Sequence, residues 1–199
     1  MSILGDQMVY KIFIFLIFLI LTACNNNSSI IDPQDVNSFF SSDMPNSPGI
    51  WWIYEYHDQD NNLDLVLNRE ILESQSDISM IRNIYINHDS TVLDIDTIYY
   101  KITEDDFSIK QTGQWKKYML FPAARDLRWT TGDGDQLTVV STTESVKLTS
   151  GEFFNCVKVV SQKENRAYYY ANGIGLLIIE NLDESRYKYL KLISFSELL

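Results

Sequence analysis

Residues Ile78–His88 read ISMIRNIYINH, and their alternation is the clearest sign of the fold. Apolar and polar residues take turns along most of this stretch. That is the pattern of a β-strand, because successive side chains of a strand point to opposite faces of a sheet. The stretch therefore predicts one strand with two chemically different faces. One face carries Ile78, Met80, Ile84 and Ile86, and the other carries Asn83, Tyr85 and Asn87.

The same strand–turn–strand pattern extends from this stretch in both directions, over residues 50–195. Short segments rich in β-branched and aromatic residues are separated by polar turns, such as DQDNN at 58–62 and Asn172-Gly173. Asn-Gly tolerates positive φ at both central positions of a tight turn and so indicates a hairpin. About a dozen strands at this spacing predict an all-β antiparallel meander. Such a sheet must curve, and we expect a half-barrel, a barrel or a two-layer sandwich.

One short N-terminal helix is expected before the sheet. Asp32 can cap its first turn, and Pro33 suits the position after the cap. Val36, Phe39 and Phe40 would then share one face of the helix. Ser41-Ser42 and the following cluster rich in Pro and Gly would end it.

The start of the chain has the features of a secretion signal. Residues Ile12–Leu21 form an unbroken apolar run after Lys11. The run has the length of a signal-peptide core and is far shorter than the roughly 20 residues of a membrane-spanning helix. It ends in Leu21-Thr22-Ala23-Cys24, which resembles the lipobox of bacterial lipoproteins. In that family the cysteine is lipidated and the signal is cut before it, so the resemblance implies that Cys24 carries the lipid.

This resemblance also implies a location in the cell envelope. Asn25 follows the cysteine where an inner-membrane lipoprotein tends to have Asp, which implies the outer membrane, facing the periplasm, in a Gram-negative cell, or otherwise the cell surface. Met8 offers a second start with a tighter signal, and either start gives the same mature protein. The chain is therefore expected to have three parts. These are a signal peptide over 1–23, a lipid-anchored tether with the short helix over 24–49, and one β domain over 50–199.

Charge and cysteine content narrow the possible partners. The chain has 16 basic and 27 acidic residues, a net charge of −11, and such a surface repels nucleic acid. With Cys24 lipidated, Cys156 has no cysteine left to pair with, so an intramolecular disulfide is not expected. Large apolar residues flank Cys156, and it is predicted to be a buried, unreactive thiol.

Three segments of the second half resemble a group of envelope lipoproteins that has no assigned activity. In the third segment, Asn172 stands where the group usually has proline. The resemblance implies a shared fold and location more than a biochemical function. The segments are Leu120-Phe121-Pro122 with Trp129, Gly151-x-Phe153-x-x-Cys156-x-Lys158-Val159, and Tyr168-Tyr169-Tyr170-Ala171-Asn172-Gly173-Ile174-Gly175-Leu176.

One stretch has the spacing of a metal site. Alternating carboxylate and amide oxygens are the ligands of a calcium loop, and they occur here at Asp58, Asp60, Asn62 and Asp64. The central glycine is missing, however, and Arg69 stands where the bidentate glutamate belongs. A solvated hairpin turn is the favoured interpretation, with calcium as the weak alternative. No spacing joins His57, His88 and a carboxylate in a zinc motif.

The aromatic residues offer a possible ligand site. Trp51, Trp52, Tyr54 and Tyr56 lie on one predicted strand and could line a groove for an apolar or sugar ligand, or else pack the core. Few helices are available to close a larger cavity. We therefore expect a mostly filled interior, with at most a shallow aromatic groove beside this strand.

No catalytic motif stands out in the sequence. It lacks GxSxG, HExxH and CxxC patterns, so we expect a protein that is not an enzyme and needs no cofactor. The leading hypothesis is a lipid-anchored envelope protein that binds a partner protein or an apolar ligand. One alternative is a lipid or lipoprotein carrier of the LolA/LolB type, and a weaker one is an envelope hydrolase. The carrier alternative is disfavoured because such carriers close an apolar cavity with helices, and only Pro33–Ser42 could form one here.

Overall fold

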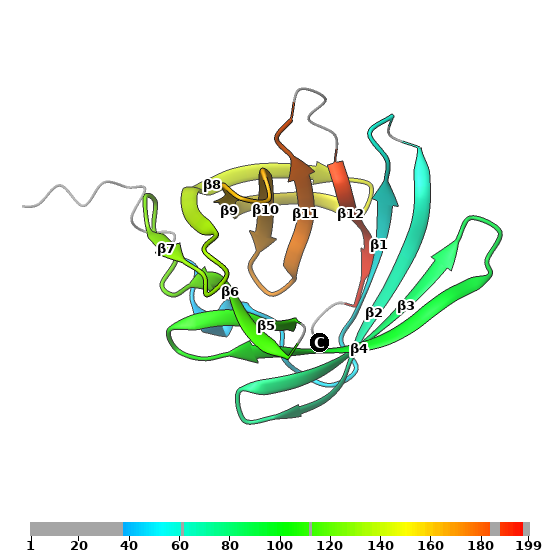
Figure 1. Cartoon of the computed structure of the whole chain (residues 1–199), viewed down its shortest axis with the longest axis horizontal. Coiled ribbons are helices and arrows are strands. Elements are labelled where there is room, and N and C mark those ends of the chain that lie inside the picture. The colour runs from blue at the N-terminus through cyan, green and yellow to red at the C-terminus, as the bar shows by residue number, and fades with distance from the viewer. Residues whose placement is uncertain (1–37, 61, 112, 184–187, 197–199) are drawn as a thin grey trace, which may run out of the picture. The chain divides into compact units, whose positions relative to one another are not determined.

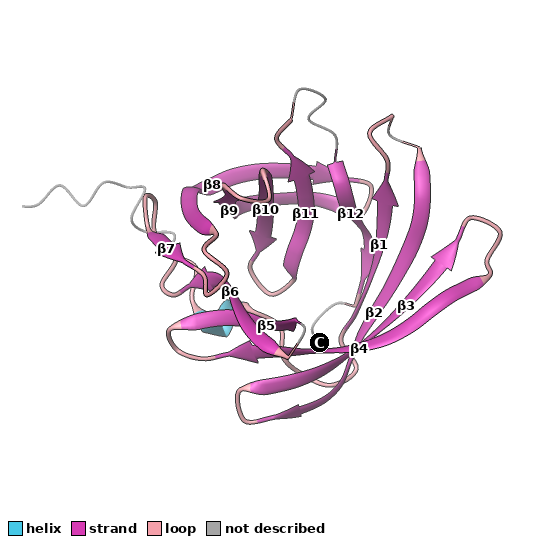
Figure 2. Cartoon of the chain, in the orientation of Figure 1, coloured by secondary structure: helices cyan, strands magenta, loops and turns pink. Residues whose placement is uncertain are grey.

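The computed structural model describes residues 38–60, 62–111, 113–183 and 188–196. One antiparallel sheet of twelve strands makes up most of this part of the chain (Figures 1 and 2). The expected all-β class is confirmed. The strands are β1 (Trp51–His57), β2 (Leu63–Gln75), β3 (Ile78–Asn87), β4 (Val92–Ile102), β5 (Asp106–Gln111), β6 (Gln114–Leu120), β7 (Arg128–Thr130), β8 (Gln136–Leu148), β9 (Gly151–Ser161), β10 (Arg166–Ala171), β11 (Gly175–Asn181) and β12 (Lys188–Phe195).

The sheet is a meander that curls into a nearly closed, barrel-like shape (Figure 1). Its strand order is β6-β5-β4-β3-β2-β1-β12-β11-β10-β9-β8-β7, so strands that follow one another in the chain pair as hairpins. The consecutive strands β6 and β7 do not pair, because they are the two edges of the sheet. Strand β1 pairs with β12 as well as with β2. The first and last strands thus meet in the middle of the sheet, and the seam of the barrel falls in the middle of the chain.

Side chains join the two edge strands across the seam. The indole Nε1 of Trp129 in β7 donates to the carbonyl oxygen of Lys117 in β6 at 3.2 Å. Beside it, Lys116 Nζ in β6 lies 2.6 Å from a carboxylate oxygen of Glu164 and 3.4 Å from one of Asp135. These contacts join β6 to β7 and to the turns that precede β8 and β10, whereas β6 and β7 are the unpaired edges of the sheet.

Strand β3 alternates as its sequence predicts, but its more polar face is the one turned toward the interior. Ser79, Ile81 and Asn83 are buried, whereas the intervening residues are at least partly exposed. On the outer face Ile84 of β3 lies opposite Ile95 of β4, which is 58% exposed. A polar residue can face inward here because Asn83 is hydrogen-bonded on both sides, to Arg69 and to Asp96.

Residues 38–50, which we call the N-terminal strap, cross one end of the barrel. Phe39 stacks on Phe121 with ring centroids 6.2 Å apart, and its carbonyl accepts from the amide of Ala123 at 2.8 Å. Further along, the amide of Gly173 donates to the carbonyl of Asp43 at 2.8 Å. The strap reaches β2 where the amide of Gly49 donates to the β2 backbone at 2.9 Å. These contacts bind the strap to both halves of the sheet.

The expected N-terminal helix is not formed in the described part of its range. Phe39 makes an isolated β-bridge with Ala123, and Phe40 has extended backbone angles. Only η2 (Ser41–Asp43), a single 3₁₀ turn, is helical. Burial of Phe39 and its backbone bonds to the barrel end outweigh the weak helix preference of so short a segment. The rest of that range, with Asp32, Pro33 and Val36, lies outside the described residues.

The described residues contain no helix with the length and hydrophobicity needed to cross a membrane. The signal-like segment and Cys24 lie outside the described part of the chain.

Candidate functional site

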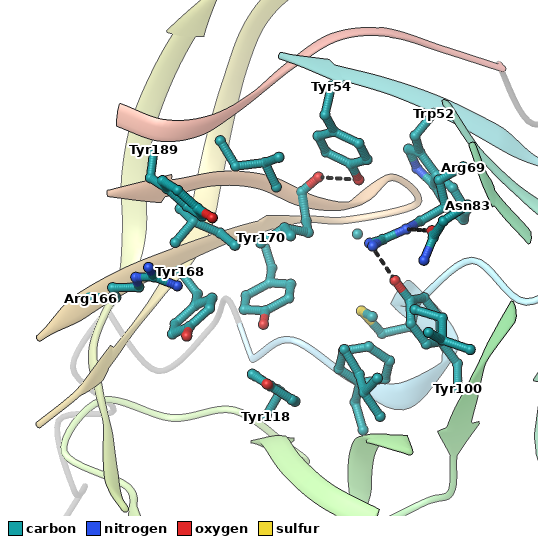
Figure 3. Close-up of a pocket in the computed structure, with 18 of the residues that line it drawn as sticks. Trp52, Tyr54, Arg69, Asn83, Tyr100, Tyr118, Arg166, Tyr168, Tyr170 and Tyr189 are labelled. Atoms are coloured by element: carbon teal, nitrogen blue, oxygen red, sulfur yellow. Dashed lines mark hydrogen bonds between the residues drawn. The ribbon is translucent and has the colours of Figure 1, made fainter. Parts of the chain in front are cut away.

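A cavity of about 330 Å³ lies inside the curved sheet (Figure 3). It extends from Met44 and Pro45 of the strap to Glu164 and Arg166, where β10 begins. Its volume is at the lower end of the range for small-molecule sites. Most of its wall is aromatic. The aromatic side chains that line it are Trp52, Tyr54, Tyr56, Tyr85, Tyr100, Phe107, Tyr118, Tyr168, Tyr170 and Tyr189.

Strand β1 supplies three of the four aromatic residues expected at a groove. Trp52, Tyr54 and Tyr56 line the cavity. Trp51 does not, because it has the opposite parity along the strand, and it is 38% exposed on the outer face.

The sequence predicted a mostly filled interior, and this prediction was wrong. The curved sheet lines a partly open cavity of about 330 Å³ instead of a shallow groove. The physical reason is strand number, since about eight strands give a barrel that side chains can fill and a wider sheet leaves a lumen. Twelve strands are paired here.

The hairpin of β10 and β11 fixes two of these aromatic rings. Trp52 Nε1 donates to the carbonyl of Ile174 at 2.7 Å, and the Tyr54 hydroxyl donates to the carbonyl of Leu176 at 3.0 Å. The turn needs Gly175, which has φ +85°, and a Cβ there would lie 3.4 Å from Pro45 of the strap. The hairpin expected from the Asn-Gly sequence thus connects one wall of the cavity to the strap.

Arg69 of β2 is the cation of the cavity wall. Its Nε donates to Asn83 Oδ1 at 2.8 Å, and its Nη1 donates to the Tyr100 hydroxyl at 2.6 Å (Figure 3). The guanidinium carbon also lies 5.6 Å from the ring centroid of Tyr54 and 5.7 Å from that of Tyr100. Among the described residues, no carboxylate forms an ion pair with Arg69.

Asp96 is linked to Arg69 through Asn83 and forms no direct bond to the guanidinium. Its Oδ1 accepts from Asn83 Nδ2 at 2.7 Å, and its Oδ2 accepts from the Tyr85 hydroxyl at 3.4 Å. Asn83 therefore holds the guanidinium with its oxygen while its own amide is held by the carboxylate. Burial opposes the charged form of Arg69, but interactions with Tyr100 and other nearby tyrosines leave its pKa raised, so the group stays cationic.

Tyr54, Tyr85, Tyr100 and Tyr170 of the wall remain neutral hydrogen-bonding groups. Burial raises the pKa of Tyr54, Tyr100 and Tyr170 well away from neutrality, and burial with the Asp96 charge raises the pKa of Tyr85 to about 12. Tyr170 is only 2% exposed, and its hydroxyl has no hydrogen-bond partner among the described residues.

The charged groups at the far end of the cavity contact other side chains. Lys116 contacts both Glu164 and Asp135, and burial, which lowers its pKa, is outweighed by Glu164, so the net pKa is raised. The Tyr168 hydroxyl donates to Glu164. Arg166 lies 4.4 Å from the ring centroid of Tyr189 and donates to Asn181 Oδ1 at 3.1 Å. This end contributes to the structure of the seam.

The candidate calcium stretch forms the turn between β1 and β2. Asp58 Oδ1 accepts from the amides of Asp60 and Asn62 at 3.0 and 2.8 Å, and Asp58 Oδ2 accepts from Asn62 Nδ2 at 3.1 Å. These bonds, the Asn62 side-chain bond foremost, lower the pKa of Asp58. Asp64 is an exposed residue of β2. No group of three metal-ligating side chains occurs within the described ranges.

The histidines and the free cysteine lie away from the cavity. His57 Nε2 is 3.1 Å from Glu55 Oε2, and His88 is exposed in the turn after β3. Cys156 is fully buried, as expected, and burial raises the pKa of its thiol to about 11.

Sequence reasoning did not single out Arg69, Asn83 or Tyr100 as site residues. A signal was present: Arg69 shares the parity of the buried residues Leu67 and Ile71 on β2. A cation on the inward face of a strand needs a partner or a function.

Two solved structures are similar to this chain. No protein-family model and no curated protein matches the sequence. One structure is a protein of Bacteroides fragilis NCTC 9343 inferred to be exported and described as having a YmcC-like fold, and the other is a protein of Parabacteroides distasonis ATCC 8503 inferred to be a lipoprotein. Both have 15% identity and a TM-score of 0.54, and the alignments cover 80% of this chain and 100% and 99% of those chains. At this identity the likeness shows the fold.

Proposed function

We propose that this protein is a non-enzymatic, lipid-anchored protein of the bacterial cell envelope that binds a small ligand inside its barrel-like sheet. The observation that carries the proposal is the aromatic cavity of about 330 Å³. Protein interiors are otherwise packed about as densely as crystals, so a cavity of this size calls for an occupant.

The wall chemistry supports binding over catalysis. A general acid or base works best when its pKa lies near the working pH. Among the described residues of the wall, the tyrosine pKa values that shift are raised away from neutrality, and Glu164 is paired with Lys116. The aromatic rings offer flat apolar faces and hydroxyls, which suit recognition of a compact organic molecule.

The cavity volume also favours a small ligand over the cargo of a LolA/LolB-type carrier. A molecule with several acyl chains needs far more space than the low end of the small-molecule range. Within the described residues, the end of the barrel is crossed by the irregular strap and its single 3₁₀ turn, not by helices that could open and close.

The envelope location rests on the lipobox at Leu21–Cys24. The similar structures, one inferred to be exported and one inferred to be a lipoprotein, support that location. If the cell is Gram-negative, Asn25 after the cysteine favours the outer membrane, with the β domain in the periplasm.

Two fluorescent probes test the binding function. Anilinonaphthalene is uncharged, and anilinonaphthalene sulfonate is the same ring system with an anion. We expect saturable one-to-one binding of at least one probe to the wild type. Ile98→Trp, which places a large ring on the cavity wall, should weaken binding by at least about tenfold. The matched control is Ile95→Trp, on the outer face of the same strand, which should bind as the wild type does.

Two results would refute the proposal. One is the absence of saturable binding of either probe to the folded wild type. The other is an equal effect of Ile98→Trp and Ile95→Trp on binding, since the probe would then bind somewhere other than the cavity.

A further inference from the structure

Arg69 has no carboxylate partner among the described residues, in contrast to several other cations of the barrel. Lys116 pairs with Glu164, Lys117 with Asp106, and Arg82 on the outer face with Glu70 at 2.5 Å. Arg69 instead lies among aromatic rings on the cavity wall. A charge in such surroundings is costly unless it is paired, so its retention on this face points to a partner that comes from outside the chain.

The unused donors around Arg69 define what that partner is. A guanidinium has five N–H donors, and the described residues use two of those of Arg69. The Tyr100 oxygen accepts from Arg69, and within the described part of the chain its own O–H has no acceptor, so it can donate to a ligand on the cavity wall (Figure 3). This is a set of donors with one positive charge, which suits an oxygen anion.

The guanidinium is held in place before any ligand arrives. Asn83, itself fixed by Asp96, binds one edge of the guanidinium, and the rings of Tyr54 and Tyr100 lie beside it. An arginine fixed in this way loses little conformational freedom when it binds, which favours affinity and orientation. The two carboxylates near the cavity are already engaged, Asp96 with Asn83 and Glu164 with Lys116.

We propose that the ligand of this cavity carries a single oxyanion group, a carboxylate or a phosphate, bound by Arg69 with the hydroxyl of Tyr100. The uncharged body of the ligand packs against the aromatic wall formed by Trp52 and the tyrosines. This inference rests on the proposed binding function and adds the chemical class of the ligand.

The two naphthalene probes separate the inference from the proposed function. Anilinonaphthalene sulfonate should bind the wild type at least about tenfold more tightly than uncharged anilinonaphthalene, the size expected for a charge-assisted bond. If both probes bind with equal affinity, the cavity function stands and the oxyanion inference is overturned. If neither probe binds, the proposed function itself fails.

Substitutions of Arg69 locate the anion. Arg69→Gln should lower the affinity for the sulfonate by at least about tenfold and leave binding of the uncharged probe unchanged. Arg69→Lys keeps the charge and should lose less. The matched control is Arg82→Gln on the neighbouring strand, which removes an arginine from the outer face and should change neither affinity. Circular dichroism confirms that each variant is folded, and the comparison of probes on the wild type decides the question if Arg69→Gln is not. Equal sulfonate affinity of folded Arg69→Gln and wild type would overturn the assignment.

Competition experiments distinguish the two kinds of oxyanion. Decanoate, decyl phosphate and decanol share one alkyl chain and differ in the head group. Stronger displacement of the bound sulfonate by decanoate identifies a carboxylate site, and stronger displacement by decyl phosphate identifies a phosphate site. Displacement by decanol at the same concentration as either anion would contradict the proposal.

Discussion

Arg69 of β2 and Asn83 of β3 lie directly opposite each other in the sheet, and the arginine Nε donates to the Asn83 Oδ1 at 2.8 Å. Both residues face the interior, so this cross-strand pair places a cation and an amide on a wall that is otherwise mostly aromatic. Because both residues occupy inward-facing positions of their strands, this pair supplies polar groups to the cavity wall.

Removing Asn83 should destabilise the protein as well as loosen Arg69. Asn83→Ala removes the partner of the Asp96 Oδ1 and that of the arginine Nε, and we expect a loss of about 1–3 kcal/mol in the free energy of unfolding. Urea denaturation followed by circular dichroism measures it. Asn68→Ala is the control, because the Asn68 Oδ1 on the outer side of β2 already lacks a partner, and its loss should stay within about 0.5 kcal/mol. Equal losses in both variants would contradict the role of Asn83.

The seam predicts a difference between two tryptophans. Trp129→Phe keeps a ring but removes the donor to the Lys117 carbonyl, so it should lower the free energy of unfolding by about 1 kcal/mol. Trp115 lies on β6 and is 38% exposed, so Trp115→Phe should cost little. If thermal denaturation shows the same midpoint for the two variants, the indole bond contributes nothing to closing the barrel.

Two adjacent phenylalanines test the strap. Phe39 is 4% exposed and stacks on Phe121, whereas Phe40 is 51% exposed. Phe39→Ala should therefore cost about 3–5 kcal/mol and Phe40→Ala less than about 0.5 kcal/mol. Chemical denaturation of both variants measures the difference. Similar costs would instead fit a helix in which the two rings share a face.

Cys156 predicts a loss of stability in alkali. Burial raises the pKa of its thiol from 9.0 to about 11 in the folded protein. Between these values the unfolded chain releases the thiol proton and the folded chain keeps it, so the free energy of unfolding falls as pH rises. Comparison of wild type with Cys156→Ala by urea denaturation between pH 9 and 11 should show a steeper fall in the wild type. Parallel curves would mean that the thiol titrates alike in both states.

Lipidation predicts where the protein is found. Cys24→Ser should release the protein from the membrane fraction of its own host, because a single residue would carry all the acyl chains and two or more chains hold firmly. Fractionation and intact-mass measurement of the native protein check this. An unmodified Cys24 in the membrane-bound wild type would contradict the lipobox interpretation.

The strands were predictable because their signals are local. Alternation in Ile78–Asn87 and the Asn-Gly turn at 172–173 are both properties of neighbouring residues, and the structure has a strand and a hairpin there. Which face of a strand turns inward depends on partners elsewhere in the chain. Asn83 faces the interior because Arg69 and Asp96 satisfy its amide, and the alternation of β3 alone does not contain that information.

The strap and the cavity were not predictable for a related reason. The Phe39 conformation is set by Phe121 and Ala123, which are more than eighty positions away in the sequence. The cavity exists because twelve strands close into one wide wall, and closure depends on side chains that meet across the seam, such as Trp129 and Lys117. The local signals of the site were the aromatic residues of β1, of which Trp52, Tyr54 and Tyr56 line the cavity, and the inward parity of Arg69.

The most direct test is native mass spectrometry of the protein purified from its own host. We expect one small molecule with one anionic group bound per chain, retained in Ile95→Trp, reduced in Arg69→Gln and absent in Ile98→Trp. A folded wild-type protein that carries no small molecule, or the same molecule bound equally to Ile98→Trp, would contradict it.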